Sequence, residues 1–468
     1  NAFEPVKCRL IFCPFFGRNR GCLRLGISIG FAELGVFAFF SNQGAPLRRL
    51  GLLLLGLSLG QANGWAAADT IGVFPAEIQL HVNDQQRLLV HQPLAGGMVR
   101  DLSREASFSS DNPTVVTVED GILRAVSEGL AKVRVEVGAR VLNVDVAVVP
   151  AVKDARLSFV GDVLPVLAKA GCAGGSCHAK PQGQNGFSLS VFSFDPKSDY
   201  REVVKDQRGR RVFPALPSES LLLKKPTLAV EHEGGKRLEV GSPFYRIIHD
   251  WIAGGMLYQR PDEPELVGIE VFPDDWSYEK EAEQQLVVTA RYQNGLRRDV
   301  THLADFASNE KELVEVGENG LVQVGSLNGE GVIVVRYMGE VALARITVPT
   351  SRQFGDAVYS GLPVNNFIDE KAHGRFQKLG ILPSDLCTDA EFIRRAFIDV
   401  LGVLPEPAEV RHFLADEDAT KRGRLIDRLL DDPRYADTWA NRWGDLFRPN
   451  IARVGLKSAY TIDNWIRE

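Results

Sequence analysis

The chain has 468 residues, too many for a single hydrophobic core, and this length predicts about three or four domains. Hydrophobic residues make up 45% and charged residues 24%, which is the composition of soluble globular domains. The formal net charge of −6 leaves no surplus of Lys and Arg for binding phosphate backbones, so nucleic acid is excluded as an expected partner.

Residues 1–68 have the pattern of a secretory leader. They contain seven Lys and Arg against two Asp and Glu, and two arginines, an apolar run and three alanines follow one another over residues 48–68. The apolar run is too short to span a bilayer, and a buried core helix is its alternative interpretation. We expect a leader and signal peptide over 1–68, with 1–44 as an over-extended gene start. The exported mature chain, without a transmembrane helix, is then periplasmic or on the cell surface.

Residues 69–150 have the alternating pattern of β-strands. The runs 132–137 and 141–146 alternate apolar and polar side chains with the period of two that half-buried strands require. The stretch Arg100-Asp101-Leu102-Ser103 recurs 198 residues later as Arg298-Asp299-Val300-Thr301. We therefore predict two small antiparallel β-sandwiches, one over 69–150 and one over 266–349.

Between the two repeats, residues 156–263 change from strand to helix spacing. Apolar residues from Phe159 to Ala170 fall on one face of a helix of about three turns. A second apolar stripe runs from Tyr245 to Ile252 and is followed by the stop signal Gly254-Gly255. This middle segment is therefore predicted to be a mainly α, loop-rich domain.

The middle segment also carries the most informative motif of the chain, Cys172 and Cys177 followed directly by His178. Covalent haem attachment needs two thiols for the two vinyl groups and an imidazole for the iron. The usual spacing is C-x-x-C-H, and here two further residues separate the thiols. The intervening residues are small and include two glycines, so they can bulge outward. We predict one covalent haem c, bound through Cys172 and Cys177, with His178 as an iron ligand.

A second axial ligand is expected if the iron is six-coordinate, and histidine or methionine supplies it in electron-transfer cytochromes. His232 ranks first, because it lies in a loop whose glycines let the backbone approach a flat ligand. Met256, after the end of the second helix, is the alternative. His249 falls on that helix and is expected to be a surface or packing histidine.

Two other interpretations of the cysteine pair remain open. Cys172 and Cys177 can form a local disulfide in an oxidising compartment, with His178 as a bystander. Two Cys and one or two His can also supply the tetrahedral ligands of a zinc ion. The absence of a second Cys-x-x-Cys or a His pair from the sequence argues against zinc.

Residues 362–468 are predicted to form an all-α domain. Thr388 and Glu391 have the spacing of a capping box, and Gly402 is positioned to end the helix that follows. The apolar residues between them, from Phe392 to Leu401, are expected to be its buried face. Similar stripes occur in 425–430 and 439–447. No catalytic constellation is visible, so no catalytic residue is predicted, and we expect this domain to be truncated.

The middle and last segments resemble those of large planctomycete-type exported proteins. Residues 157–260 look like their cytochrome-c-like domain, and the C-terminal third is similar to their helical domain of unknown function. The two β repeats resemble bacterial Ig-like group 2 domains. The residues that carry these resemblances are Ser176-Cys177-His178, Gly183-Gln184-Asn185-Gly186-Phe187, Gly209-Arg210-Arg211, Gly234-Gly235-Lys236-Arg237, Arg395-Ala396-Phe397-Ile398-Asp399 and Trp439-Ala440-Asn441-Arg442-Trp443.

The resemblance implies a multidomain fold of two all-β Ig-like sandwiches flanking a mainly α cytochrome-c-like domain, followed by an all-α domain. It also implies an exported haem-binding protein. Single-electron transfer to an unknown redox partner protein is the first functional hypothesis. The alternatives are an accessory part of an extracytoplasmic enzyme, and a cell-surface adhesion or scaffold protein without haem that binds a surface polysaccharide or protein through its Ig-like domains.

Overall fold

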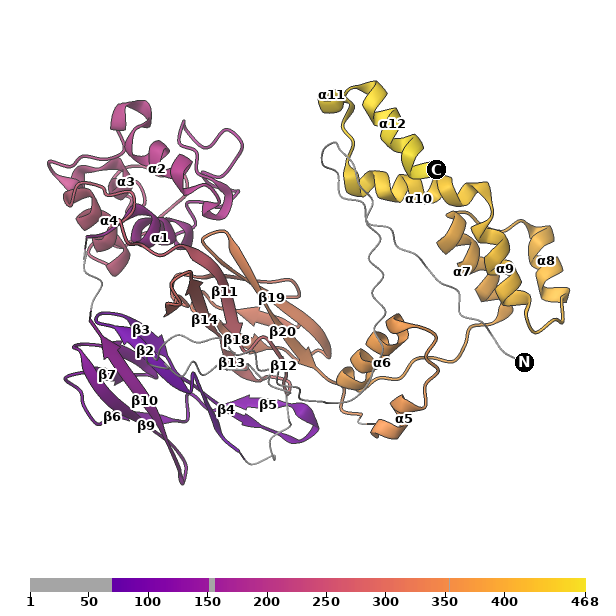
Figure 1. The fold of residues 1–468 in the computed structure, drawn as a ribbon, viewed down its shortest axis with the longest axis horizontal. Coiled ribbons are helices and arrows are strands. Elements are labelled where there is room, and N and C mark those ends of the chain that lie inside the picture. The colour runs from indigo at the N-terminus through magenta and orange to yellow at the C-terminus, as the bar shows by residue number, and fades with distance from the viewer. Residues whose placement is uncertain (1–69, 151–155, 353) are drawn as a thin grey trace, which may run out of the picture. The chain divides into compact units, whose positions relative to one another are not determined.

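The computed structural model describes residues 70–150, 156–352 and 354–468 (Figure 1). The expected leader, residues 1–68, lies outside this part of the chain. Within it, no helix is both long and apolar enough to cross a membrane. Two β repeats and a helical C-terminal region are present, which confirms the expected multidomain fold in its coarse form. The cytochrome-c-like character of the middle segment stays a prediction.

The first repeat, drawn in indigo and violet in Figure 1, consists of three small sheets. The four-stranded sheet has the order β2-β10-β9-β6, in which only the β2–β10 pair is parallel. Two three-stranded sheets, β1-β4-β5 and β3-β8-β7, complete it. Alternate residues of β9 are buried, as their period of two predicts. The strands are β1 (Gly72–Phe74), β2 (Glu77–His81), β3 (Gln85–Arg87), β4 (Leu89–Pro93), β5 (Val99–Asp101), β6 (Ser107–Ser110), β7 (Val116–Glu119), β8 (Ile122–Ala125), β9 (Gly129–Val137) and β10 (Arg140–Val149).

The second repeat has the same topology. Its sheets have the orders β12-β20-β19-β16, β11-β14-β15 and β13-β18-β17, again with one parallel pair, β12–β20. Its core is formed by side chains equivalent to those of the first repeat, among them the fully buried Val288, Ile333 and Val335. The strands are β11 (Leu266–Phe272), β12 (Asp275–Ser277), β13 (Glu283–Gln285), β14 (Val287–Tyr292), β15 (Arg297–Asp299), β16 (Asp305–Ser308), β17 (Val314–Val316), β18 (Leu321–Val324), β19 (Gly329–Tyr337) and β20 (Glu340–Val348).

The middle segment contains short helices joined by long turns. They are α1 (Leu164–Lys169), α2 (Pro196–Val204), α3 (Leu221–Lys224) and α4 (Pro243–Ala253). Helix α4 begins after the capping residue Ser242, and it ends at Gly254, the stop that the sequence predicts. The expected helix from Phe159 instead starts as one π-helical turn, Phe159–Val163, and becomes α-helical only at Leu164. In this turn the Ser158 carbonyl accepts from the N–H groups of Asp162 and Val163, four and five residues on, both at 3.2 Å.

The core of the middle segment is built where these helices meet. Phe159, Leu164, Ile248 and Ile252 are fully buried, and Trp251 is 1% exposed. The indole of Trp251 donates to the Leu257 carbonyl at 2.9 Å, so its one polar atom is satisfied inside the core. This packing fixes the C-terminal end of α1, from which the cysteine motif starts.

The C-terminal region is all-helical. Thr388 and Glu391 form the expected capping box, and Gly402 ends α7 in a left-handed conformation with φ 69°. Ile393, Phe397 and Leu401 of α7 are buried, as expected. The helices are α5 (Asp356–Ser360), α6 (Phe367–Leu379), α7 (Asp389–Leu401), α8 (Pro407–Ala415), α9 (Lys421–Leu430), α10 (Pro433–Phe447), α11 (Ile451–Val454) and α12 (Leu456–Arg467).

The buried face expected for residues 439–447 is wrong. Trp443 is 47%, Leu446 72% and Phe447 52% exposed. Helix α10 turns another face inward: Ala440 is buried, and the Thr438 hydroxyl donates to the Leu401 carbonyl at 2.6 Å. The small residue and the hydroxyl allow α10 to approach the end of α7 closely, and this contact decides its rotation.

Candidate functional site

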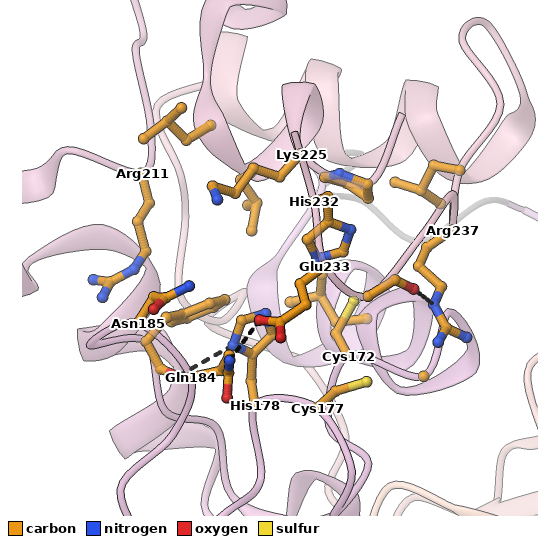
Figure 2. A pocket seen from close by; sticks show the side chains of 18 of the residues that line it. Cys172, Cys177, His178, Gln184, Asn185, Arg211, Lys225, His232, Glu233 and Arg237 are labelled. Atoms are coloured by element: carbon orange, nitrogen blue, oxygen red, sulfur yellow. Dashed lines mark hydrogen bonds between the residues drawn. The ribbon is translucent and has the colours of Figure 1, made fainter. Parts of the chain in front are cut away.

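One cavity in the middle segment collects the predicted site residues. It has a volume of about 250 Å³ and is lined by Cys172, Cys177, His178 and His232 (Figure 2). Apolar side chains from α1, α3 and the following loops form much of the remaining wall: Leu167, Phe187, Leu221, Leu222, Pro226 and Leu238. Cationic side chains, among them Lys225 and Arg237, lie at its edge.

The cysteines are presented by a tight turn that follows α1. The backbone N–H of Cys172 donates to the Leu167 carbonyl at 3.0 Å, and that of Cys177 donates to the Gly174 carbonyl at 2.9 Å. The N–H of His178 then returns to the Cys172 carbonyl at 3.2 Å, so the four residues between the thiols form a closed bulge. The five-residue step between the two thiols is therefore accommodated with both side chains directed at one cavity (Figure 2).

Both thiols are free, so the disulfide considered from the sequence is not formed in this structure. Burial, together with the neighbouring Cys177, raises the pKa of the Cys172 thiol to about 11. The thiol of Cys172 is therefore protonated at neutral pH, and its nucleophilicity is low until a reaction partner or a maturation enzyme activates it.

The imidazole of His178 is held from behind. Its Nδ1 lies 3.2 Å from the Phe187 carbonyl oxygen, and the ring centroids of His178 and Phe187 lie 4.5 Å apart. Burial lowers the pKa of His178, and the neighbouring His232 and Arg211 act in the same direction. The ring is therefore neutral at pH 7, with Nδ1–H donating to the carbonyl and the Nε2 lone pair left for another ligand.

The imidazole of His232 is held in the same way. Its Nδ1 lies 2.7 Å from the Gly235 carbonyl oxygen, which again leaves Nε2 as the free nitrogen. The His178 and His232 rings have centroids 6.4 Å apart and planes inclined by only 13°. Two imidazoles with the same tautomer thus lie on facing walls of one cavity (Figure 2).

The other two candidate ligands lie elsewhere. Met256 is not among the residues that line the cavity: it packs against the core, and its carbonyl accepts the Tyr200 hydroxyl at 2.8 Å. The His249 ring contacts Asp250 at 2.8 Å and stacks on Tyr245 at 6.1 Å, in the surface role expected for it. Of the three candidates, the structure brings His232 to the cysteine motif.

Sequence reasoning missed a buried arginine behind His178. Arg211 is 6% exposed, donates to the Glu202 carbonyl at 2.6 Å and to the Gly186 carbonyl, and its guanidinium lies 4.5 Å from the Phe187 ring. It therefore fixes the turn 183–187, whose Phe187 carbonyl orients His178. The glycines of that turn indicate a close backbone approach, since a side chain at Gly183 would overlap the Phe187 carbonyl oxygen, but they do not identify Arg211.

The two histidine-bearing loops are also joined directly. The Gln184 side-chain amide, from the turn behind His178, donates to the Glu233 carboxylate at 2.8 Å, and Glu233 is the residue after His232 (Figure 2). The spacing of the two imidazoles is thus set by a hydrogen bond as well as by the core. Among the described residues, no group of three or more His, Cys, Asp or Glu is arranged to hold a metal ion.

Comparison with known proteins gives one family model and a set of solved structures. No curated protein matches it. Domains 5–6 of the surface-layer protein SbsC are 12% identical, over 60% of this chain and 98% of that one, with a TM-score of 0.25. The adhesin InvE of Yersinia pseudotuberculosis is 11% identical, over 60% and 58%, with a TM-score of 0.15. Residues 364–468 match the family model described as PSCyt2, a protein of unknown function (DUF1549), which confirms the expected similarity of the C-terminal helices to a domain of unknown function.

Proposed function

We propose that the middle segment binds one haem c covalently through Cys172, Cys177 and His178, with His232 as the second axial ligand, and that it transfers single electrons. The observation that supports this most strongly is the pair of facing imidazoles. Each has its Nδ1 tied to a backbone carbonyl, and both line the cavity that contains the two free thiols. Histidines that ligate metals usually donate their other ring N–H to a carbonyl or carboxylate in this way.

The separation of the rings fits a shared ion. His178 and His232 would hold one metal ion between them if each contributed a bond of about 2.0 Å through Nε2. The observed separation is 6.4 Å. The apolar walls suit the faces of a porphyrin, and the cations Lys225 and Arg237, against the single anion Glu233, suit its two carboxylates.

The haem would supply reversible one-electron chemistry, and the chain would bind and orient it. Cys172 and Cys177 would hold the haem covalently through their sulfurs, and His178 and His232 would hold its iron. Because burial lowers the pKa of His178, its ring offers a lone pair rather than a second proton at neutral pH. The carbonyls of Phe187 and Gly235 would keep both rings in the ligating tautomer. Export to the periplasm or the cell surface, and an unidentified redox partner protein, belong to the same proposal.

The cysteines give a direct test with a matched control. Cys172→Ala with Cys177→Ala, expressed with a haem c maturation system, should yield protein whose haem is extracted by acidified acetone. Cys387, the third described free cysteine, lies in the C-terminal region, so Cys387→Ala should retain acid-stable haem. Retention of covalent haem by the double variant would move the attachment site elsewhere.

The second candidate function is a cell-surface scaffold without haem. The specific observation in its favour is that two of the described units are closed Ig-like sandwiches with apolar cores, an architecture that serves as a spacer or adhesive module. A colourless exported protein with unmodified Cys172 and Cys177, prepared with the same maturation system, would favour this function over electron transfer. Binding of the chain to cell-wall polysaccharide would then be the next measurement.

A further inference from the structure

The two Ig-like repeats contact each other through one aspartate each, and the two contacts are equivalent. Asp101 Oδ2 accepts the backbone N–H of Gln285 at 2.8 Å, and Asp299 Oδ2 accepts the backbone N–H of Arg87 at 2.7 Å. Asp299 follows Asp101 by 198 residues, and Gln285 follows Arg87 by the same 198 residues. Each repeat thus provides a carboxylate to the other and receives one in return.

The second oxygen of each carboxylate, Oδ1, accepts a hydrogen bond within its own repeat. Asp101 Oδ1 accepts the N–H of Ser103 at 2.8 Å, and Asp299 Oδ1 accepts the N–H of Thr301 at 2.9 Å. The hydroxyls of Ser103 and Thr301 accept the backbone N–H groups of two equivalent residues, Val90 and Val288, both at 2.9 Å. In each R-D-x-[ST] stretch, the aspartate Oδ1 therefore closes a turn within its own repeat, and the aspartate Oδ2 binds a backbone N–H of the opposite repeat.

Two further contacts are reciprocal, whereas the ion pair between Arg298 and Asp84 at 2.7 Å has no equivalent, because residue 282 is Ala and Arg100 pairs with Glu105 in its own repeat. The equivalent residues Phe74 and Phe272 stack on each other, with centroids 3.8 Å apart and planes inclined by 11°. The ion pair between Arg104 and Glu283 has its counterpart in the 2.9 Å contact between His302 and Gln85. A surface patch that meets its own equivalent in the partner is the hallmark of two-fold, isologous association.

We propose that the aspartate of R-D-x-[ST] is the binding group of an isologous joint, and that the partner this surface fits is the backbone edge of another repeat of the same kind. Within this chain, the joint unites both repeats into one platform. At this interface Asp299 is 6%, Gln284 1% and Gln285 8% exposed, whereas Asp101 is only partly buried and lines an open cavity together with Arg87 and Gln285. A carboxylate taken out of water at such a place requires its N–H partners, so the contact is specific for this pairing.

The joint has a consequence for the middle segment, which lies between the repeats in the sequence. Lys169, the last residue of α1, donates to the Ala304 carbonyl at 2.6 Å and to the Glu318 carbonyl, both in the second repeat. Lys169 is two residues from Gly171, where the cysteine turn begins. The segment that contains the cavity is therefore held to the platform by direct hydrogen bonds as well as by its chain connections. This proposal does not depend on haem.

Hydrogen exchange of single backbone amides in the full chain tests the joint. In the unmodified protein, the Arg87 and Gln285 amides should exchange slowly. Asp101→Ala should speed exchange at Gln285 by at least about tenfold, and Asp299→Ala should do the same at Arg87. Asp111→Ala is the matched control, because Asp111 accepts the Lys132 N–H at 2.7 Å within one repeat. It should release Lys132 and leave Gln285 protected.

Two results would overturn the proposal. One is exchange at Arg87 and Gln285 in the unmodified chain as fast as in an unstructured peptide, a result that requires no variant. The other is unchanged protection of Gln285 in Asp101→Ala. The buried strand amides of Val135 and Val335 report whether each repeat remains folded. If Asp101→Ala unfolds its repeat, Asp101→Asn keeps an acceptor oxygen without the charge and should give a smaller increase at Gln285.

Discussion

The alanine variant of Gly234 probes the role of His232 sterically, without altering the imidazole itself. A Cβ built on Gly234 would lie 2.9 Å from Cε1 and 3.1 Å from Nε2 of His232, whereas ordinary van der Waals contact begins at 3.4 Å. The ring must then move by several tenths of an ångström, and its Nε2 is one of the two atoms that meet the added carbon. Overpacking of this kind costs about 1–3 kcal/mol. A displacement of this size is large for a nitrogen that has to sit about 2.0 Å from a metal.

Gly241, in the same segment, provides the matched control. It adopts a φ of +75°, and a Cβ there would meet nothing within 4 Å. Gly241→Ala therefore costs about 1–2 kcal/mol of backbone strain without touching His232 or the carbonyl that holds its ring. In haem-loaded protein, Gly234→Ala should convert a low-spin ferric spectrum wholly or partly to high-spin, while Gly241→Ala should remain low-spin. Equal low-spin spectra for both variants and the unmodified protein would refute the assignment of His232 as axial ligand.

Three further predictions concern separate parts of the molecule. Arg211→Gln should leave the Glu202 carbonyl without its donor, which costs about 1–3 kcal/mol of stability. It should also lower the reduction potential of the haem, because a buried positive charge is lost, whereas Arg211→Lys keeps the charge and should keep most of the potential. Equal reduction potentials in the two variants would contradict this. Because burial lowers the pKa of His178, the unfolded haem-free chain binds a proton more readily than the folded one, so the middle segment without haem should be most stable above about pH 6.5 and lose stability as the pH falls below it. Amide protection factors over 156–263 that are as high at pH 5 as at pH 7.5 would argue against a neutral buried ring. Phe397→Ala, at a fully buried site of α7, should destabilise the C-terminal helices by about 3–5 kcal/mol in amide exchange, against about 0.5 kcal/mol or less for the partly exposed Ile398→Ala.

The sequence predicted local features well where one stretch of chain decides the outcome. The capping box at Thr388, the left-handed Gly402 and the stop at Gly254 all occur as expected, because each depends on residues within one or two turns. The repeated strand pattern likewise predicted two sandwiches, because side chains that alternate with a period of two point in turn toward the core and toward solvent.

The features that the sequence did not predict depend on partners far away in the chain. The recurrence of Asp101 as Asp299 was visible, but its contact with a backbone N–H in the other repeat was not, because a backbone acceptor or donor leaves no trace in a side-chain pattern. The outward face of Trp443 was missed for a similar reason: the stripe is apolar, and only the close contact of Thr438 with the end of α7 shows which side turns inward.

The candidate site was predicted from the sequence only in part. Cys172, Cys177 and His178 follow one another in the sequence, so their common direction could be predicted, and His232 was ranked first because of its glycines. The support behind them could not be predicted in the same way. Arg211 acts through the carbonyls of Gly186 and Glu202, and its burial is a property of the folded segment.

The most direct measurement is the visible absorption spectrum of the purified, dithionite-reduced protein together with its intact mass, after export in a host that matures haem c. The account predicts sharp c-type bands and a mass increase of one haem that persists under denaturing conditions. A colourless protein whose mass equals that of the polypeptide alone, with the thiols of Cys172 and Cys177 free or joined to each other, would contradict it.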